Sequence, residues 1–244
     1  MERRPLSAAK KVERKILRSN SPNTLWTVHS FPSLPSDIVA RILSRLAANG
    51  TIKRVRKGIY YRPIETLLGP SIPDPIAVAK AVAQIKGRNV VLGGYTAYNA
   101  LGITTQVAGK VTLITNKSIK SPATKNKHVR LIERPVYSTM MPEERSILDA
   151  LRDINRISDT SPTKIVARIV KLIRSKKLSF GRLVHFALRN EPPRVRALLG
   201  IIGESIKAPK SLLNLLYRSL NSTTTFKIRI DPPFNSAQEW RMAG

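Results

Sequence analysis

One stretch of this sequence constrains its fold more than any other: an amphipathic segment, residues 37–48, ends at Asn49-Gly50 and leads directly into a basic segment, residues 51–62. At 100° per residue, the apolar side chains of the first segment fall within one arc of a helix: Ile38, Val39, Ile42, Leu43 and Leu46. The opposite arc is polar or small and consists of Asp37, Arg41, Ser44 and Ala48, with Arg45 at its edge. Ser36 stands where an N-cap belongs, and Gly50 can adopt the left-handed conformation that ends a helix. The pattern predicts a helix over 37–48 that buries its apolar side and presents its polar side outward.

The basic segment predicts a tight β-hairpin. It contains no acidic residue, and Arg56-Lys57-Gly58 has the composition of a turn. Its cations are Lys53, Arg54, Arg56, Lys57 and Arg62, and Tyr60 and Tyr61 add rings with hydroxyl groups. A helix followed by a charged hairpin is typical of a winged helix-turn-helix, in which the hairpin holds phosphates and the helix enters the major groove. A merely solvated basic hairpin is the alternative interpretation.

The winged helix-turn-helix interpretation predicts which residues contact DNA. They are Ser36, Arg41, Ser44, Arg45, Lys53, Arg54, Arg56, Lys57, Tyr60 and Arg62. Arg41 and Arg45 are long enough to reach guanine edges, and Ser44 can hydrogen-bond a base or a phosphate. Asp37 can accept from a cytosine amine or favour the positive end of the helix dipole, and we prefer the second role.

The net charge points to a polyanionic partner. The 244 residues include 43 Lys and Arg against 15 Asp and Glu, which gives a formal net charge of +28 at pH 7. Cations outnumber anions in every third of the chain, so a DNA footprint can extend beyond the first domain. Nucleic acid is the first candidate partner, and a membrane surface or an acidic protein is the second.

The absence of cysteine excludes disulfides, thiolate nucleophiles and cysteine-ligated zinc. The first residues lack an apolar core of signal-peptide length, and no run approaches 18 apolar residues. We therefore expect a cytoplasmic, soluble protein with no membrane-spanning segment.

Turn residues divide the chain into two expected domains. Residues 67–73, rich in Gly, Pro and Ser, predict a junction between a winged helix-turn-helix over 1–66 and a second domain over 72–244. In the first domain we expect a helix over 6–19 and a compact short helix and turn over 25–35. In the second, Asp74-Pro75 begins a helix that ends at Gly87.

Hydrophobic patterning predicts the remaining elements of the second domain. Helices are expected over 95–101, from Pro142, from Pro162, and over 179–189, 193–207 and 210–220, with strands over 89–92, 110–115, 128–133 and 225–230. The order predicts an α+β protein, in which an N-terminal winged helix-turn-helix is followed by a mixed α/β, helix-rich C-terminal domain.

Motifs that could indicate catalysis have simpler interpretations. Gly93-Gly94 lacks the Lys-Ser/Thr of a P-loop, and the strand over 111–115 has no carboxylate to hold the metal ions of a nucleotidyltransferase. We interpret this glycine pair as a strand-to-helix turn. The three histidines (His29, His128 and His185) are not at metal-ligand spacing and are expected to be structural or on the surface.

The acidic residues near position 150 also have a structural interpretation. Glu143, Glu144, Asp149 and Asp153 alternate with Arg145 and Arg152 on one predicted helix, which indicates a solvated, ion-paired face. We expect no catalytic residue, no metal site, no cofactor and no enzymatic activity. A nuclease or transferase is the competing hypothesis and would show metal-dependent turnover.

Three blocks of the sequence resemble a known family. Residues 46–63 are similar to the wing of the AbiEi-type antitoxins, the transcriptional-regulator half of type IV toxin–antitoxin (abortive infection) systems. Residues 96–107 with 111–115 resemble the alanine-rich helix, the Leu-Gly-Leu-Thr-Thr-Gln-like turn and the strand of that family, and 192–200 resemble a C-terminal helix in one branch. The block at 96–107 is the more specific, since many winged helices have a similar wing. The proline-rich segment 31–35 departs from the family pattern and leaves the start of the following helix open.

The resemblance implies a sequence-specific transcriptional autorepressor that also acts as an antitoxin. Two copies would bind inverted repeats in the promoter of their own gene, and the C-terminal domain would counter a co-encoded nucleotidyltransferase-like toxin without forming a stable complex. The C-terminal domains of this family often add positive surface to DNA binding, which agrees with the excess of cations beyond residue 66. The alternative is a basic architectural DNA- or RNA-binding protein without a toxin partner. A neighbouring reading frame with a nucleotidyltransferase pattern would distinguish the two.

Overall fold

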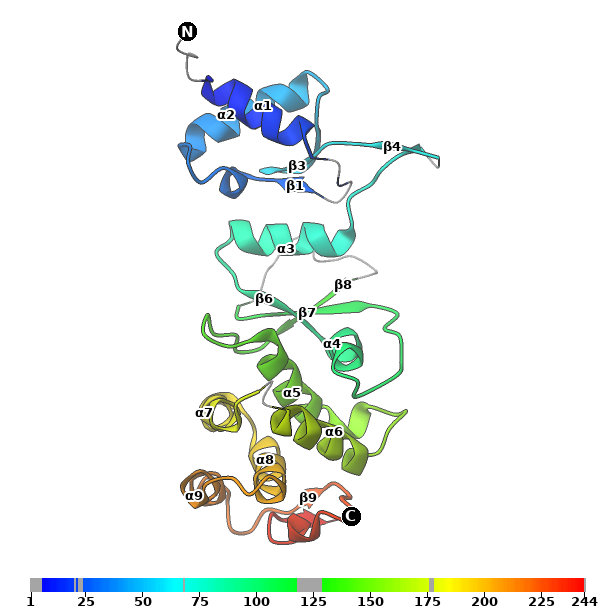
Figure 1. Cartoon of the computed structure of the whole chain (residues 1–244), viewed down its shortest axis with the longest axis vertical. Coiled ribbons are helices and arrows are strands. Elements are labelled where there is room, and N and C mark those ends of the chain that lie inside the picture. The colour runs from blue at the N-terminus through cyan, green and yellow to red at the C-terminus, as the bar shows by residue number, and fades with distance from the viewer. Residues whose placement is uncertain are drawn as a thin grey trace. The chain divides into compact units, whose positions relative to one another are not determined.

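The computed structural model of the chain describes residues 6–19, 21, 24–67, 69–117, 129–175 and 178–243. These residues form a mixed α+β protein, as the sequence predicts (Figure 1). Contacts divide the chain into two compact units. The N-terminal unit comprises Met1–Val90 with Lys117–Leu131, and the C-terminal unit comprises Val91–Asn116 with Ile132–Gly244.

The N-terminal unit begins with two helices and a small sheet. Its elements in chain order are α1 (Ala8–Leu17), β1 (Leu25–Trp26), the 3₁₀ helix η1 (Val28–Ser30), α2 (Ser36–Ala48), β2 (Lys53–Arg56), β3 (Ile59–Tyr61), the short pair β4 (Glu65–Thr66) and β5 (Gly69–Pro70), and α3 (Pro75–Ile85). β1, β3 and β2 form one antiparallel sheet with β3 in the centre. The short helix and turn expected over 25–35 is therefore replaced in part by strand β1, because Leu25 and Trp26 pair with the distant Tyr61 and Tyr60.

Both faces of this sheet are buried. Successive strand residues point to opposite faces, and paired residues on neighbouring strands share a face. Trp26 and Tyr60 pack with Val12 and Ile16 of α1 and with the apolar side of α2. On the other face, Ile59 packs with residues 81–83 of α3. The sheet therefore lies between the α1–α2 pair and α3 (Figure 1).

Helix α3 accounts for the difference between this division and the boundary expected at residues 66–72. Asp74 caps the helix, accepting hydrogen bonds from the amides of Ile76 (3.0 Å) and Ala77 (3.4 Å), which agrees with the predicted helix start. The helix nevertheless belongs to the N-terminal unit, because its alanine-rich side packs on the sheet. The composition of residues 67–73 marks a loop, but it does not reveal with which unit the following helix packs.

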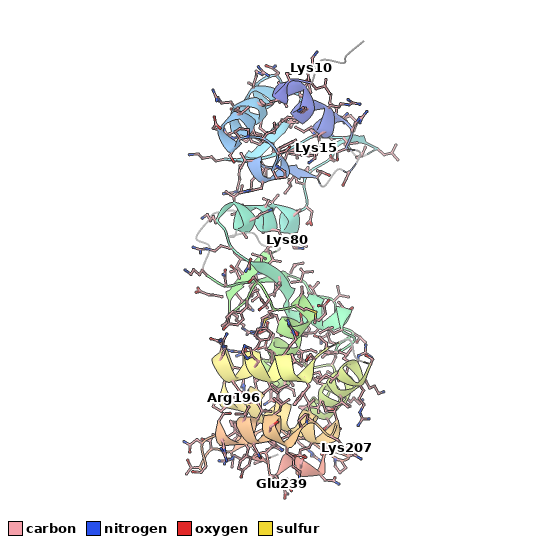
Figure 2. All side chains as sticks on the ribbon, turned by 60° about the vertical axis from the view of Figure 1, so that its left-hand side comes forward. Lys10, Lys15, Lys80, Arg196, Lys207 and Glu239 are labelled. Atoms are coloured by element: carbon pink, nitrogen blue, oxygen red, sulfur yellow. The ribbon has the colours of Figure 1, made fainter. Side chains whose placement is uncertain are left out.

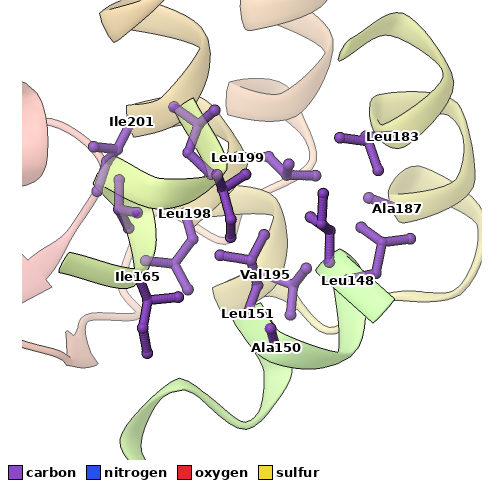
Figure 3. Close-up of a cluster of buried hydrophobic side chains, with 14 of the residues drawn as sticks. Leu148, Ala150, Leu151, Ile165, Leu183, Ala187, Val195, Leu198, Leu199 and Ile201 are labelled. Carbon is purple, nitrogen blue, oxygen red and sulfur yellow. The ribbon is translucent and has the colours of Figure 1, made fainter. Parts of the chain in front are cut away.

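The C-terminal unit is mainly helical. Its helices are α4 (Gly94–Ala100), α5 (Pro142–Arg152), η3 (Ile154–Arg156), α6 (Pro162–Arg174), α7 (Phe180–Asn190), α8 (Pro193–Ser205), α9 (Lys210–Arg218) and η4 (Asn235–Ala237). The unit also holds β7 (Val111–Thr115), β6 (Val90–Gly93) apart from Val90, and the last two residues of β8 (Val129–Glu133). These three strands form a sheet with β7 in the centre, and β9 (Phe226–Lys227) pairs in parallel with β10 (Met242–Ala243). Apolar side chains of α5, α6, α7 and α8 meet in one core (Figure 3). The last expected strand, 225–230, is thus much shorter than predicted.

The Gly93-Gly94 pair is a strand-to-helix turn, as expected. Gly94 has φ +59°, a left-handed conformation that glycine adopts without strain. A β-carbon on Gly93 would collide with the side chain of Ile114, and one on Gly94 would lie 2.8 Å from the Thr112 hydroxyl oxygen. Both positions therefore need glycine for the close approach of β6 and α4 to β7.

Two of the four acidic residues, Glu144 and Asp149, do not lie on the solvated face that the sequence predicts, whereas Glu143 is exposed. Glu144, Arg145 and Asp149 are fully buried. Arg145 Nη2 lies 2.8 Å from Asp149 Oδ1 and 2.8 Å from Oε1 of Glu191, the C-cap residue of α7. Further arginines close the network: Arg134 pairs with Asp149, Arg152 with Glu191, and Arg182 with Glu144. The predicted ion pairing is confirmed, but the predicted solvent exposure is wrong for Glu144 and Asp149, because arginines and a carboxylate on other elements neutralise the buried charges.

The turn after α4, which belongs to the more specific of the resembling blocks, is fixed by one carboxylate. Asp159 accepts hydrogen bonds from the Thr104 hydroxyl (2.6 Å), from the Thr105 amide (2.9 Å) and from the Thr105 hydroxyl (3.1 Å). These hydrogen bonds hold the pKa of Asp159 below its usual value, and the bond from the Thr104 hydroxyl has the largest effect. This part of the block therefore has a structural role in the C-terminal unit.

Candidate nucleic-acid interface

Helix α2 has the two sides that its sequence predicts. Val39, Ile42, Leu43 and Leu46 are buried, and Ile38 packs against them. The opposite side is exposed and comprises Ser36, Asp37, Ala40, Arg41, Ser44, Arg45 and Ala48. The helix ends at Asn49, and Gly50 follows with φ +75°. The predicted reading face is therefore accessible, and its backbone is fixed by the core beneath it.

The start of α2 differs from the prediction by one residue. Ser36 is the first helical residue, and Pro35 occupies the N-cap position. Proline has no side-chain acceptor, so the first amides of α2 are not capped in the way expected from a serine hydroxyl. Ser36 is exposed in the first turn, where its hydroxyl and the neighbouring amides can meet a phosphate.

Arg41 is already partnered. Its Nη2 lies 2.9 Å from Oδ2 of Asp37, one turn earlier, and the two side chains are 77% and 69% exposed. Such an exposed pair contributes at most about 1 kcal/mol to stability, so it can open when another anion competes for the arginine. Arg45 and Ser44 are also exposed, and we place Arg45 first among the candidates for a guanine edge.

The basic hairpin, residues 53–61, forms as predicted. Lys53 pairs with Tyr61, Arg54 with Tyr60 and Arg56 with Ile59, with an irregularity between Arg54 and Arg56. Gly58 has φ +79° in the turn. The side chains of Lys53, Arg54 and Lys57 are exposed, and that of Arg56 is half-buried. Since Arg54 and Tyr60 are paired, Arg54 lies on the sheet face that α1 and α2 cover.

Two of the ten predicted contact residues make structural contacts within the N-terminal unit. Tyr60 is 3% exposed and packs in the core beneath α1 and α2, so it cannot present its ring to a ligand. Arg62 Nη1 donates a 2.6 Å hydrogen bond to the carbonyl of Leu17, the last residue of α1. Alternation along the hairpin predicts that neighbouring residues face opposite ways, but it does not tell which side meets the core.

One cation at this site was not among the predicted residues. Lys86, directly after α3, lines a depression of about 180 Å³ together with Arg56 and Lys57 of the hairpin turn. The sequence placed this residue in a second domain, so nothing in the pattern connected it with the hairpin. The signal that could have found it is the alanine-rich face of α3, which requires a neighbour to cover it.

The two histidines in the described part of the chain lie on the surface. His29 and His185 are exposed, and His128 lies outside the described residues. Within the described ranges, no group of three or more His, Asp or Glu side chains is arranged to hold a metal ion. In the same part of the chain, no helix is both long enough and apolar enough to cross a membrane.

Comparison with known proteins shows the family. Residues 11–178 match DUF6088, described as a family of unknown function, and the chain belongs to this family. The match includes α2, the basic hairpin and α3. Among solved structures, the RV2827C protein from Mycobacterium tuberculosis is similar, with 14% sequence identity and a TM-score of 0.48 over 91% of this chain and 85% of that chain. The search of curated proteins found no match.

Proposed function

We propose that the first part of the N-terminal unit is a winged helix-turn-helix that binds double-stranded DNA. In this proposal α2 is the recognition helix, β2 and β3 form the wing, and η1 with residues 31–35 takes the place of the preceding helix. The chain order α1, β1, η1, α2, β2, β3 supports it, because a helix-turn-helix segment is followed directly by a two-stranded hairpin.

The observation that carries the proposal is the exposed polar side of α2. Its buried side is fixed on the core through Val39 and Leu43, both fully buried, so the exposed side is presented on a rigid element. Arg45 and Ser44 would approach base edges there, with Arg41 after its pair with Asp37 opens. Arg54 lies on the sheet face that α2 covers and would hold a phosphate beside the groove.

The phosphate-binding set is smaller than the sequence suggests. Lys53, Arg54, Arg56 and Lys57 remain, whereas Arg62 is engaged at the end of α1. If four phosphates are neutralised, affinity should fall roughly 10²-fold between 50 and 200 mM salt. The net charge of +28 also favours rapid encounter with a polyanion.

The resemblance to AbiEi-type antitoxins extends the proposal to a biological role. The protein would repress its own promoter by binding inverted repeats as two copies, and it would counter a nucleotidyltransferase-like toxin encoded beside it. Co-expression with the neighbouring gene product in a growth assay tests that role. Rescue of growth supports the antitoxin, whereas its absence supports a basic architectural DNA- or RNA-binding protein.

DNA binding itself is tested with Arg45→Ala. We expect this variant to bind duplex DNA from upstream of its gene more weakly by about 5- to 150-fold, since a guanine contact contributes about 1–3 kcal/mol. Binding to a scrambled duplex should change far less. Arg218→Ala, which removes an exposed cation of α9 in the C-terminal unit, is the matched control. Equal affinities of wild type and Arg45→Ala for both duplexes would refute α2 as the recognition helix.

A further inference from the structure

The basic hairpin is supported from behind by a helix that sequence patterns assign to another domain. Val55 and Ile59 of the hairpin pack against Ala81, Val82 and Ala83 of α3. The alanines let the helix approach the sheet closely. At the turn, a β-carbon on Gly58 would lie 3.7 Å from Cδ1 of Ile85, so the last turn of α3 reaches the tip of the hairpin.

This contact creates a small depression with a distinct chemistry. It has a volume of about 180 Å³, an apolar floor of Ile59, Val82 and Ile85, and a rim of Arg56, Lys57 and Lys86. Among the described residues that line it, none is acidic. Arg56 belongs on this side of the sheet because it pairs with Ile59, which packs on α3.

Three cations on one rim favour a shared anion. Their positive potentials add at the depression and attract an anion to it. A guanidinium can donate two parallel hydrogen bonds to phosphate oxygens, and each ammonium adds a point charge. Charge and size therefore fit one phosphate group of a nucleic-acid backbone.

We propose that Lys86, with Arg56 and Lys57, binds a backbone phosphate of double-stranded DNA, so that α3 is part of the DNA interface. This inference rests on the proposed function. The contact contributes affinity and orientation but reads no bases.

The test is the salt dependence of duplex binding by Lys86→Ala in the full chain. Without Lys86 the shared phosphate is only partly neutralised, so the slope of log K against log salt should fall by up to about 0.9, and the loss of affinity between 50 and 200 mM salt should shrink by up to about three- to four-fold. Upstream and scrambled duplexes should be affected equally. Lys86→Arg should restore the wild-type slope. Lys80→Ala is the matched control, since Lys80 is exposed on the same helix and does not line the depression (Figure 2).

The outcomes separate this inference from the function on which it rests. If the wild type binds duplex DNA and Lys86→Ala keeps the wild-type slope, Lys86 does not contact a phosphate, although the DNA-binding proposal stands. If Lys86→Ala weakens binding to one duplex and not to the other, the contact is to a base and the backbone assignment is wrong. If the wild type fails to bind duplex DNA at any salt concentration, both proposals fail.

Discussion

The guanidinium carbon of Arg54 lies 5.6 Å from the centre of the Tyr60 ring, on the residue directly opposite in the hairpin. The ring is buried in the core and the arginine is exposed, so the pair connects the interior of the N-terminal unit to its basic surface. This arrangement makes Tyr60 a support for Arg54 and not a contact residue itself.

Tyr60→Phe should therefore leave both the dissociation constant for DNA and the free energy of unfolding close to those of the wild type. Tyr60→Ala should lower the free energy of unfolding by about 3–5 kcal/mol, because it leaves a cavity beneath α2. Urea denaturation measures the stability, and fluorescence anisotropy with a labelled duplex measures the affinity. A large loss of affinity in Tyr60→Phe at unchanged stability would mean that the hydroxyl meets DNA after all.

Arg62→Ala should act on stability and not on the electrostatics of binding. The variant loses the hydrogen bond to the Leu17 carbonyl at the end of α1, which we expect to cost about 1 kcal/mol of unfolding free energy. The salt slope of DNA binding should stay at the wild-type value. Arg18→Ala, an exposed cation beside the same helix end, controls for charge. A reduced slope in Arg62→Ala but not in Arg18→Ala would show that Arg62 contacts a phosphate.

Arg145→Met should be among the most damaging single substitutions in the C-terminal unit. It leaves the buried carboxylates of Asp149 and Glu191 without their shared partner, and we expect a loss of about 3–5 kcal/mol in the free energy of unfolding. Asp37→Ala breaks the exposed pair with Arg41 and should change the free energy of unfolding by less than about 1 kcal/mol. Comparable effects of the two variants in thermal or urea unfolding would contradict the buried network.

The lowered pKa of Asp159 predicts that the free energy of unfolding depends on pH in the acidic range. Its pKa in the folded state is lowered, chiefly because it accepts from the Thr104 hydroxyl, so the unfolded chain binds the proton more tightly. The stability it contributes is present above the unfolded pKa of about 3.9 and is lost as the pH falls through the lower folded pKa. Asp159→Asn should remove this component, which unfolding at a series of acidic pH values measures. A carboxyl resonance of Asp159 that titrates above 3.9 would contradict the assignment.

Much of the local structure follows from the sequence. Helix α2 begins within one residue of its expected start, Asp74 caps α3, and Pro142 and Pro162 begin α5 and α6. These features depend on residues close together in the chain, where capping groups, proline and apolar spacing act directly. Strand β1 was missed because Leu25 and Trp26 become a strand only through pairing with residues about 35 positions later.

The errors at the candidate site have the same origin. The sequence placed Tyr60 on the DNA side and Glu144 and Asp149 of α5 in solvent, and the structure buries all three. Burial depends on partners from other elements: Trp26 beside Tyr60, and Glu191 beside Arg145. Lys86 was missed for a related reason, because its neighbours at the hairpin turn are nearly thirty residues earlier in the chain.

The most direct test of the proposed interface is the salt dependence of duplex binding by the double variant Arg56→Ala/Lys57→Ala. With the two cations of the hairpin turn removed, the phosphate that they share with Lys86 is largely lost, and the slope of log K against log salt should fall by about 0.9 relative to the wild type. Lys210→Ala/Arg218→Ala removes two exposed cations from α9 and should keep the wild-type slope. If the hairpin variant binds duplex DNA with the affinity and the salt slope of the wild type, the claim that this hairpin binds the DNA backbone is contradicted.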